Sequence, residues 1–356
     1  MRRIALAVLM HDRLRALLAV LGVAAAMALL ILQWGLHAGF RAAASDLIVR
    51  LNQAEDTWGL ARGARTLEDG DLLPLETLPR LRAMTCVTSV RPLLIDFHQR
   101  READGHLQTV LLLATDADGA AALGATLPRE GELVRDASDA STASSLELRG
   151  GAVVTVVGSM QGVRSPSQAP YLLTTLSTAR ALLGLPEDTA HFVTVRADDT
   201  CLQSLRADPV LADLEWVDST YFSARAQEQW IDRTGLGRVL GFGLLLATAM
   251  AAAVLGQVLL AHVRSHRSEL AALRAAGATR WELMGFVGWQ AAWLLGVGAL
   301  LGAGMALALA PRSTLPILVD ASTLVRSCAV LLAATSTALA GAAWYVRSIK
   351  PEEILR

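Results

Sequence analysis

The sequence of 356 residues contains a single lysine, Lys350. The P-loop of nucleotide-hydrolysing proteins has the pattern G-x-x-x-x-G-K-[ST], in which the lysine reaches the phosphates of the nucleotide. Lys350 follows no such glycine-rich stretch. The sequence therefore excludes ATP hydrolysis by a P-loop within this chain.

Other signatures of catalysis are missing as well. The chain has no Gly-x-Ser-x-Gly or His-Glu-x-x-His arrangement, and its cysteines and histidines do not follow the spacing of metal ligands. Asp96 with His98, or Asp188 with His191, would be the best acid–base pairs, but such side chains in a loop-rich segment are more often solvated surface. We predict no catalytic residue, no metal site and no cofactor bound by the chain itself.

Cysteine is scarce, with three residues in the whole chain. Cys86 and Cys201 fall in one polar segment, whereas Cys328 falls in an apolar run. In an oxidising compartment the first two can form a single disulfide. Two separate structural thiols are the alternative, and the sequence leaves both open.

Charged residues are absent from four long runs, and 53% of the chain is hydrophobic, with a mean hydropathy of +0.41. The runs without Asp, Glu, Lys or Arg are residues 16–40, 239–263, 283–311 and 327–346. Each is long enough to cross roughly 30 Å of hydrocarbon. We predict four transmembrane helices, which makes the chain a multi-pass membrane protein.

The basic residues are placed unevenly around these runs. Loops rich in arginine and lysine stay in the cytoplasm, and here the basic residues gather before the first run, after the second and after the fourth: Arg2, Arg3, Arg13, Arg15, Arg264, Arg267, Arg274, Arg280, Arg347, Lys350 and Arg356. The lead 1–15, the loop 264–282 and the tail 347–356 are therefore predicted in the cytoplasm. Residues 41–234 and the loop 312–326 lie outside it. We favour a retained first helix over a cleaved signal peptide.

The segment 41–234 has the composition of a soluble mixed domain, in which Pro and Gly separate short runs with the residue pattern of a strand or a helix. Strands are predicted at residues 90–97, 109–114, 152–157, 171–174 and 191–195, and helices at 72–84 and 176–183. The fold class is thus an α-helical membrane protein with an α+β extracytoplasmic domain inserted between helices 1 and 2. The polar tract 136–145 indicates a mobile loop or hinge.

An amphipathic helical pattern lies at the end of this domain and extends almost to the second apolar run. Only Gly235 and Gly237 stand between them. We predict a stalk helix near residues 220–238, stiff enough to transmit displacement; a connector that merely packs on the domain is the alternative.

The later apolar runs carry glycine but no ionisable carboxylate, lysine or arginine. Ion and proton paths need such groups at membrane depth, which disfavours a channel or a secondary transporter. Gly298 and Gly302 have the spacing that lets helices approach closely in lipid. They predict helix packing within the chain or a dimer interface between two copies.

The most specific stretch is residues 266–277, H-R-S-E-L-A-A-L-R-A-A-G, between the second and third apolar runs. Leu270, Leu273 and Gly277 recur at helical spacing, and Gly277 stands where a helix ends at positive φ. Thr279 and Glu282 then form a capping box for the next helix. The pattern predicts a helix, a tight turn and a second helix at the cytoplasmic surface.

Residues 269–278, E-L-A-A-L-R-A-A-G-A, resemble the E-I-G-x-L-R-A-L-G-A signature of permease subunits in the MacB and FtsX-like superfamily of ABC transporters. The predicted order also resembles that family: one span, a large exported domain, three spans and a tail, here Pro351 to Arg356. A narrower likeness is to DevC-type glycolipid exporter permeases. It rests on residues 33–35, 54–58, 229–230, 234–237 and 263–266.

The resemblance implies a homodimeric permease in the bacterial inner membrane, with both termini cytoplasmic. A separate cytoplasmic ATPase would bind the ATP and Mg²⁺ and would dock on a coupling helix. The coupling residues carried over are His266, Glu269, Leu270, Leu273, Arg274 and Gly277. A periplasmic adaptor and an outer-membrane channel are further implied partners, and nucleic acid is not.

The function implied is export of lipid-like or amphipathic cargo by movement of the exported domain. The alternative is an FtsX-like mechanotransmitter that regulates an envelope hydrolase without transport; the large exported domain favours transport. A receptor domain without any ATPase is disfavoured by the coupling signature.

Overall fold

The computed structural model describes residues 13–52, 56–102, 104–139, 141–265, 267–313 and 315–348. The chain divides into two compact units. The helical unit comprises Met1–Gly39 and Gly237–Arg356, and the sheet unit comprises Phe40–Leu236. Each has hydrophobic clusters of its own.

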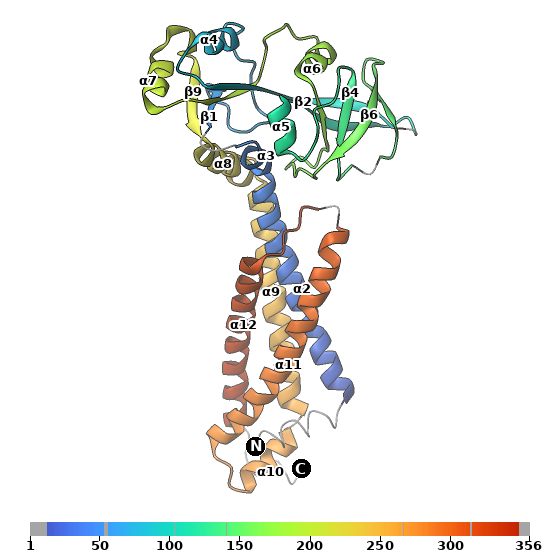
Figure 1. Ribbon diagram of the computed structural model, residues 1–356. Coiled ribbons are helices and arrows are strands. Elements are labelled where there is room, and N and C mark those ends of the chain that lie inside the picture. Colours follow the sequence, from blue (N-terminus) through green and yellow to red (C-terminus); the bar gives the residue numbers. More distant parts are fainter. Residues whose placement is uncertain are drawn as a thin grey trace. The chain divides into compact units, whose positions relative to one another are not determined.

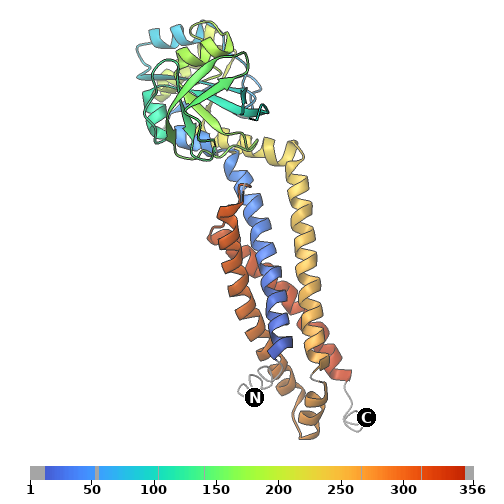
Figure 2. The same ribbon diagram turned by 90° about the vertical axis from the view of Figure 1, so that its right-hand side faces the viewer.

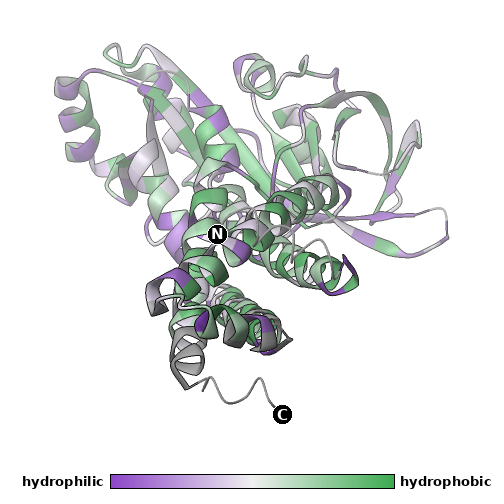
Figure 3. Ribbon diagram, turned by 90° about the horizontal axis from the view of Figure 1, so that it is seen from below, coloured by the Kyte–Doolittle hydropathy of each residue, from purple (hydrophilic) through white to green (hydrophobic). Residues whose placement is uncertain are grey.

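The helical unit contains four long helices that lie side by side (Figures 1 and 2). They are α2 (Arg13–Ala43), α9 (Leu236–Ser265), α11 (Arg280–Leu309) and α12 (Ala321–Ser348). Among the described residues, these four are long and apolar enough to cross a membrane, judged by length and composition. The ribbons of these helices are coloured mostly as hydrophobic residues (Figure 3). Three of the four apolar runs fall within these helices, and the run 283–311 extends two residues beyond α11 into the 3-10 turn Ala310–Arg312.

The fourth helix begins earlier than the charge-free run predicted, at Ala321 rather than Ser327. Asp320 supplies the cap, because its Oδ1 accepts from the Thr323 amide at 2.8 Å and its own amide donates to Thr323 Oγ1 at 3.0 Å. Arg326 lies in the first turns with its guanidinium 5.3 Å from the Trp34 ring centroid on α2. The prediction excluded every arginine from the span, and it therefore placed the start of the fourth helix too late.

Glycines bring α11 and α2 into close contact. A Cβ at Gly298 would lie 2.6 Å from Val23 Cβ, and one at Gly302 would lie 2.8 Å from Met27 Cβ and closer still to the Ala24 carbonyl oxygen. Real Cβ atoms do not approach other atoms this closely. Of the two roles predicted for these glycines, the structure shows packing between helices of one chain.

Two glycines of α2 receive the loop that precedes α12, a contact absent from our predictions. The Leu318 amide donates to the Gly35 carbonyl at 2.9 Å. A Cβ at Gly39 would overlap the Pro316 carbonyl oxygen, and one at Gly35 would lie 2.9 Å from Ile317 Cγ2. The backbone of residues 316–318 therefore rests directly on the helix.

The sheet unit is built on one sheet with the strand order β3-β7-β4-β6-β5-β2-β8-β1-β9. Its described strands are β1 (Thr57–Ala61), β2 (Ser89–Arg101), β3 (Leu107–Ala114), β4 (Glu132–Asp136), β5 (Ser145–Leu148), β6 (Val153–Met160), β7 (Tyr171–Thr174), β8 (Phe192–Arg196) and β9 (Leu214–Asp218). Pairing is antiparallel except for β3 with β7 and β4 with β6.

The long strand β2 joins two lobes of this unit (Figure 1). Its first half pairs with β8, and its second half pairs with β3 and β5. The shorter helices are α3 (Asp46–Leu51), α4 (Thr77–Ala83), α5 (Ala117–Ala122), α6 (Leu176–Leu183), α7 (Asp199–Ala207) and α8 (Ser219–Glu228). One cluster around Trp58, Phe192 and Phe222 includes residues of both lobes, so the lobes share part of their core.

Each predicted strand and helix of this unit overlaps an element of the structure, and the helix predicted at 72–84 is shorter in the structure, where α4 covers only Thr77–Ala83. Strand β7 and helix α6 have the predicted bounds, and β2, β3, β6 and β8 overlap their predictions. Four strands were missed, namely β1, β4, β5 and β9. Each has four or five residues with polar residues or glycine among them, so neither an apolar run nor a regular alternation stands out from the surrounding loops.

The tract 136–145, predicted as a mobile loop or hinge, is bonded to β2 through its described residue Asp139. The Arg100 guanidinium, 2% exposed, pairs with Asp139 and also bonds Gln108. Burial alone would raise the pKa of Asp139, but hydrogen bonds from Arg100 and from the Ser141 amide bring that pKa below its ordinary value. A polar composition predicted mobility here because the sequence does not reveal the buried arginine opposite.

The stalk is not one continuous helix. Helix α8 ends at Glu228, a π-helical turn follows over Gln229–Arg233, and α9 begins only at Leu236. Gly235 between them has φ 82°, a left-handed conformation that glycine adopts without strain and that ends a right-handed helix. The prediction of one continuous stalk helix over 220–238 is therefore wrong.

Cys86 and Cys201 form a disulfide, which decides between the two alternatives left open by the sequence. The bond ties the turn after α4 to α7 across a sequence separation of 115 residues. A cross-link of this length restricts the unfolded chain strongly and contributes roughly 2–5 kcal/mol.

Replacing both bridged cysteines by serine should therefore lower the free energy of unfolding of the sheet unit by roughly 2–5 kcal/mol. Thermal unfolding of the full-length protein in detergent measures this loss. The exposed Cys328 provides the control, because Cys328→Ser removes a free thiol and no bridge. Equal stability of the double variant and the control would show that the bridge does not stabilise the fold.

Candidate functional site

Helix α10 (Arg267–Ala275) lies at the end of the helical unit where α9 ends and α11 begins (Figure 1). It is the short amphipathic helix predicted from the leucine spacing. Among the predicted coupling residues, Glu269 is exposed, Leu273 and Arg274 are half-buried, and Leu270 lies in the same helix. His266 lies outside the described residues.

The end of α10 is fixed by backbone hydrogen bonds. The Ala278 amide donates to the Leu273 carbonyl at 3.0 Å, and the Gly277 amide donates to the Arg274 carbonyl at 3.1 Å. Together these two bonds form a Schellman motif, which requires a left-handed residue after the helix. Gly277 supplies it with φ 94°. A side chain at this position would strain the turn.

The start of α11 is fixed by a capping box. Thr279 Oγ1 accepts from the Glu282 amide at 3.3 Å, and Glu282 Oε2 accepts from the Thr279 amide at 2.8 Å. The two helices are thus joined by the turn 276–279, closed at both ends by hydrogen bonds. Both ends of the turn between α10 and α11 are therefore fixed by hydrogen bonds within the chain.

Comparison with protein families gives a match to the later part of the chain. Residues 241–351 match the family described as FtsX-like permease C-terminal. This FtsX-like segment contains most of α9, all of α10 and α11, and α12. The helix-turn-helix described above therefore lies in its middle.

Comparison with curated protein sequences finds no match. Two solved structures are similar to part of the chain at low scores. The periplasmic region of MacB from Actinobacillus actinomycetemcomitans has 13% identity and a TM-score of 0.36, covering 49% of this chain and 94% of its own. The extracellular domain of the noncanonic ABC-type transporter YknZ from Gram-positive bacteria has 10% identity and a TM-score of 0.32, covering 42% and 88%.

Neither acid–base pair considered from the sequence forms. His191 is buried, its Nδ1 accepts from the Ile95 amide at 3.3 Å, and burial lowers its pKa. Asp188 instead receives a hydrogen bond from Arg82 at 2.8 Å. Among the described residues, Asp188 and His191 therefore bond different partners within the sheet unit.

A carboxyl group that we did not predict lies against the segment 161–170. Glu68 Oε1 accepts from Ser165 Oγ at 2.8 Å and from Ser167 Oγ at 3.2 Å, while its Oε2 is buried without a hydrogen-bond partner in the described part of the chain. Burial raises the pKa of Glu68 above its ordinary value of 4.5, and the Asp69 charge adds to the rise.

An acid whose pKa is raised in the folded state holds its proton more tightly there than in the unfolded chain. Its contribution to stability is complete below pH 4.5 and is lost as the pH rises through the folded-state pKa. Glu68→Gln, which cannot ionise, should therefore unfold at the same temperature as the native protein below pH 4.5 and at a higher temperature at pH 8. Thermal unfolding across this pH range is the measurement, with the exposed Glu76→Gln as control. A native protein that gains stability relative to Glu68→Gln on raising the pH would contradict the account.

Proposed function

We propose that this chain is the membrane subunit of an ATP-driven ABC transporter and that a separate cytoplasmic ATPase docks on α10. The observation that carries the proposal is the FtsX-like match over residues 241–351, with a rigid helix-turn-helix at its centre. The missing P-loop lysine supports it, because the energy must then come from another subunit.

The contacts within the helical unit suggest how movement spreads from α10. The closed turn 276–279 links α10 to α11, and α11 is held against α2 at Gly298 and Gly302. Helix α2 in turn continues without interruption to Ala43. A displacement of α10 by the ATPase would therefore move α11 and α2 together, and α2 leads along the chain into the sheet unit.

We further propose that the protein lies in the bacterial inner membrane as a homodimer, with both termini and α10 in the cytoplasm and residues 41–234 outside it. The arginine placement supports this orientation, and the Cys86–Cys201 disulfide fits an oxidising compartment for the sheet unit. As a DevC-type exporter, the protein would pass lipid-like or amphipathic cargo to an adaptor and an outer-membrane channel.

Copurification tests the subunit class. The tagged protein, extracted in mild detergent, should bring down a cytoplasmic protein that contains a P-loop, and ATP hydrolysis should reside in that partner. An extract in which the chain is folded but no P-loop protein accompanies it would count against the proposal.

Comparing cells with and without the gene separates transport from regulation. Export predicts that a lipid or amphipathic compound disappears from the outer membrane or the medium when the gene is deleted. Unchanged compounds together with altered envelope hydrolase activity would instead indicate the regulatory function. The test needs both readouts on the same cells.

A further inference from the structure

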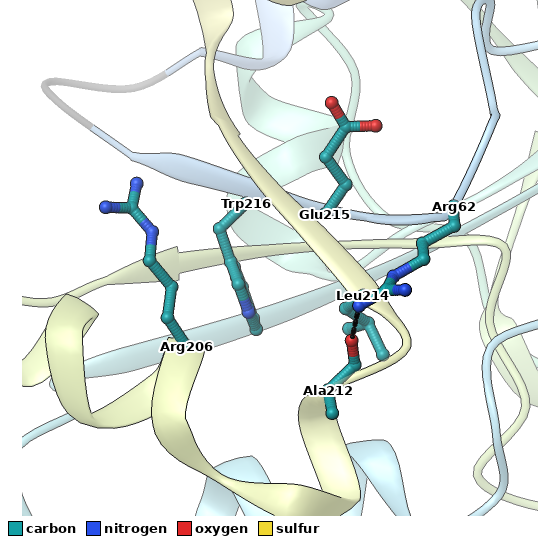
Figure 4. A pocket seen from close by; sticks show the side chains of 6 residues that line it. All are labelled: Arg62, Arg206, Ala212, Leu214, Glu215 and Trp216. Carbon is teal, nitrogen blue, oxygen red and sulfur yellow. Dashed lines mark hydrogen bonds between the residues drawn. The ribbon is translucent and has the colours of Figure 1, made fainter.

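The strand β9 lies at one edge of the sheet and pairs with β1 on its inner side. A pocket of about 450 Å³ follows this strand (Figure 4). Its lining comes from β9 and the residues just before it, from α7, and from the loop after β1: Arg62, Arg206, Ala212, Leu214, Glu215 and Trp216. The volume is in the range of ligand-binding clefts.

The charge of this pocket is positive. Arg62 Nη2 donates to the Ala212 carbonyl at 2.6 Å, which holds that guanidinium beside the start of β9 (Figure 4). Arg206 on α7 is exposed and makes no ion pair within the described residues. The carboxylate of Glu215 is neutralised by Arg225, whose Nη1 lies 2.7 Å away. Two guanidinium groups are thus available to an anionic ligand.

Trp216 supplies a second, independent observation. Its side chain is 7% exposed, and its benzo edge packs over Gly59 of the neighbouring strand, where a Cβ would lie 2.7 Å from the ring. The indole Nε1 is buried without a hydrogen-bond partner in the part of the chain that the structure describes. A buried N–H of this kind calls for an acceptor, and the residue lines the pocket.

The lining also bears on the shape of the ligand. Ala212 lies just before β9 and residues 214–216 lie within it, and β9 is an edge strand of the sheet. An edge strand presents unpaired backbone groups to an added strand. A small anion would need only the arginines, whereas an extended peptide would use the strand edge and both arginines. Acidic side chains spaced along such a peptide would complement Arg62 and Arg206.

We propose that the open edge of β9 binds an extended acidic segment of a protein partner by strand addition. The backbone of that segment pairs with β9, and its carboxylates pair with Arg62 and Arg206. Trp216 Nε1 donates to an oxygen of the bound segment. This site belongs to the sheet unit and does not involve α10. A test of this site therefore does not depend on the ATPase proposal.

The test uses the full-length protein in nanodiscs and a phage-displayed library of random nine-residue peptides. Selection should enrich peptides with acidic residues at alternate positions. Their affinity should fall at least tenfold on Arg206→Glu and stay unchanged on Arg129→Glu, the same charge reversal at an exposed arginine of the other lobe. Hydrogen exchange should slow in residues 214–218 when a selected peptide binds.

Three results would overturn the proposal. The first is no enrichment over empty nanodiscs, and the second is equal binding to the native protein and Arg206→Glu. The third is binding that depends on Arg206 without protection of residues 214–218, because this would show an anion pocket rather than an added strand. Anionic vesicles serve as a parallel probe: binding of vesicles but of no peptide would assign the arginines to lipid headgroups and refute the strand.

Discussion

Gly302→Leu is expected to abolish the native packing of the helical unit, with a loss of about 3 kcal/mol or more in the free energy of unfolding. The reason is steric. The Cβ of the new leucine would lie 2.8 Å from Met27 Cβ and closer still to the Ala24 carbonyl oxygen. The carbonyl belongs to the backbone, which cannot rotate away as a flexible side chain can. Unfolding of the full-length protein in detergent, followed by circular dichroism at increasing SDS, measures the loss.

Gly304→Leu is the matched control, because it makes the same substitution two residues along α11 where a Cβ meets no atom within 4 Å. It should leave stability within about 0.5 kcal/mol of the native protein. If Gly302→Leu and Gly304→Leu were equally stable, the close packing of α11 on α2 would be refuted. If instead both kept the monomer stable but Gly302→Leu alone abolished dimers, Gly302 would belong to a dimer interface.

Leu273→Asp is expected to prevent recruitment of the ATPase while the chain still folds and inserts. Leu273 is half-buried on α10, and a carboxylate there would lose its hydration when a partner covers the helix. Because a central interface residue commonly contributes about 2 kcal/mol or more, recovery of the partner should fall at least tenfold. Glu269→Arg should act in the same direction through its reversed charge. Quantitative pull-down from detergent measures the recovery.

Ala275→Asp is the control on the same helix, since residue 275 is exposed and lies two positions, or about 200° of helix, from Leu273. It introduces the same charge on the opposite face and should retain the partner. Equal recovery with Leu273→Asp, Ala275→Asp and the native protein would show that α10 is not the docking element. Folding of each variant is checked by its elution from a sizing column.

The sequence allowed the helical unit to be predicted in most of its parts because its signals are local. Long apolar runs, the glycine at 277 and the Thr279–Glu282 pair each depend on a few neighbouring residues, and all appear in the structure. The start of α12 was misplaced because Arg326 was assumed to lie outside the helix, whereas it stacks on Trp34 of α2. That contact joins residues far apart in the chain, which periodicity does not reveal.

In the sheet unit, too, features with a local sequence signal were predicted, and features that depend on distant contacts were not. Strand β7 was predicted because its four residues are apolar except the last, whereas β9 was missed because its five residues include Glu215 and Asp218. The disulfide was left open, since pairing of Cys86 with Cys201 depends on α4 and α7 being neighbours in space. The pocket beside β9 combines three separate segments, and no local signal in the sequence joins them.

The role of α10 as a docking element for a separate ATPase is tested most directly by photocrosslinking in cells. A photoreactive amino acid at position 269, which is exposed on α10 one turn from Leu273, should crosslink to a cytoplasmic protein that contains a P-loop. The same group at position 315, exposed in the loop before α12, should not. We predict a P-loop ATPase in the product from position 269 alone. A stable, inserted protein whose position 269 crosslinks to no P-loop protein would contradict the proposed function.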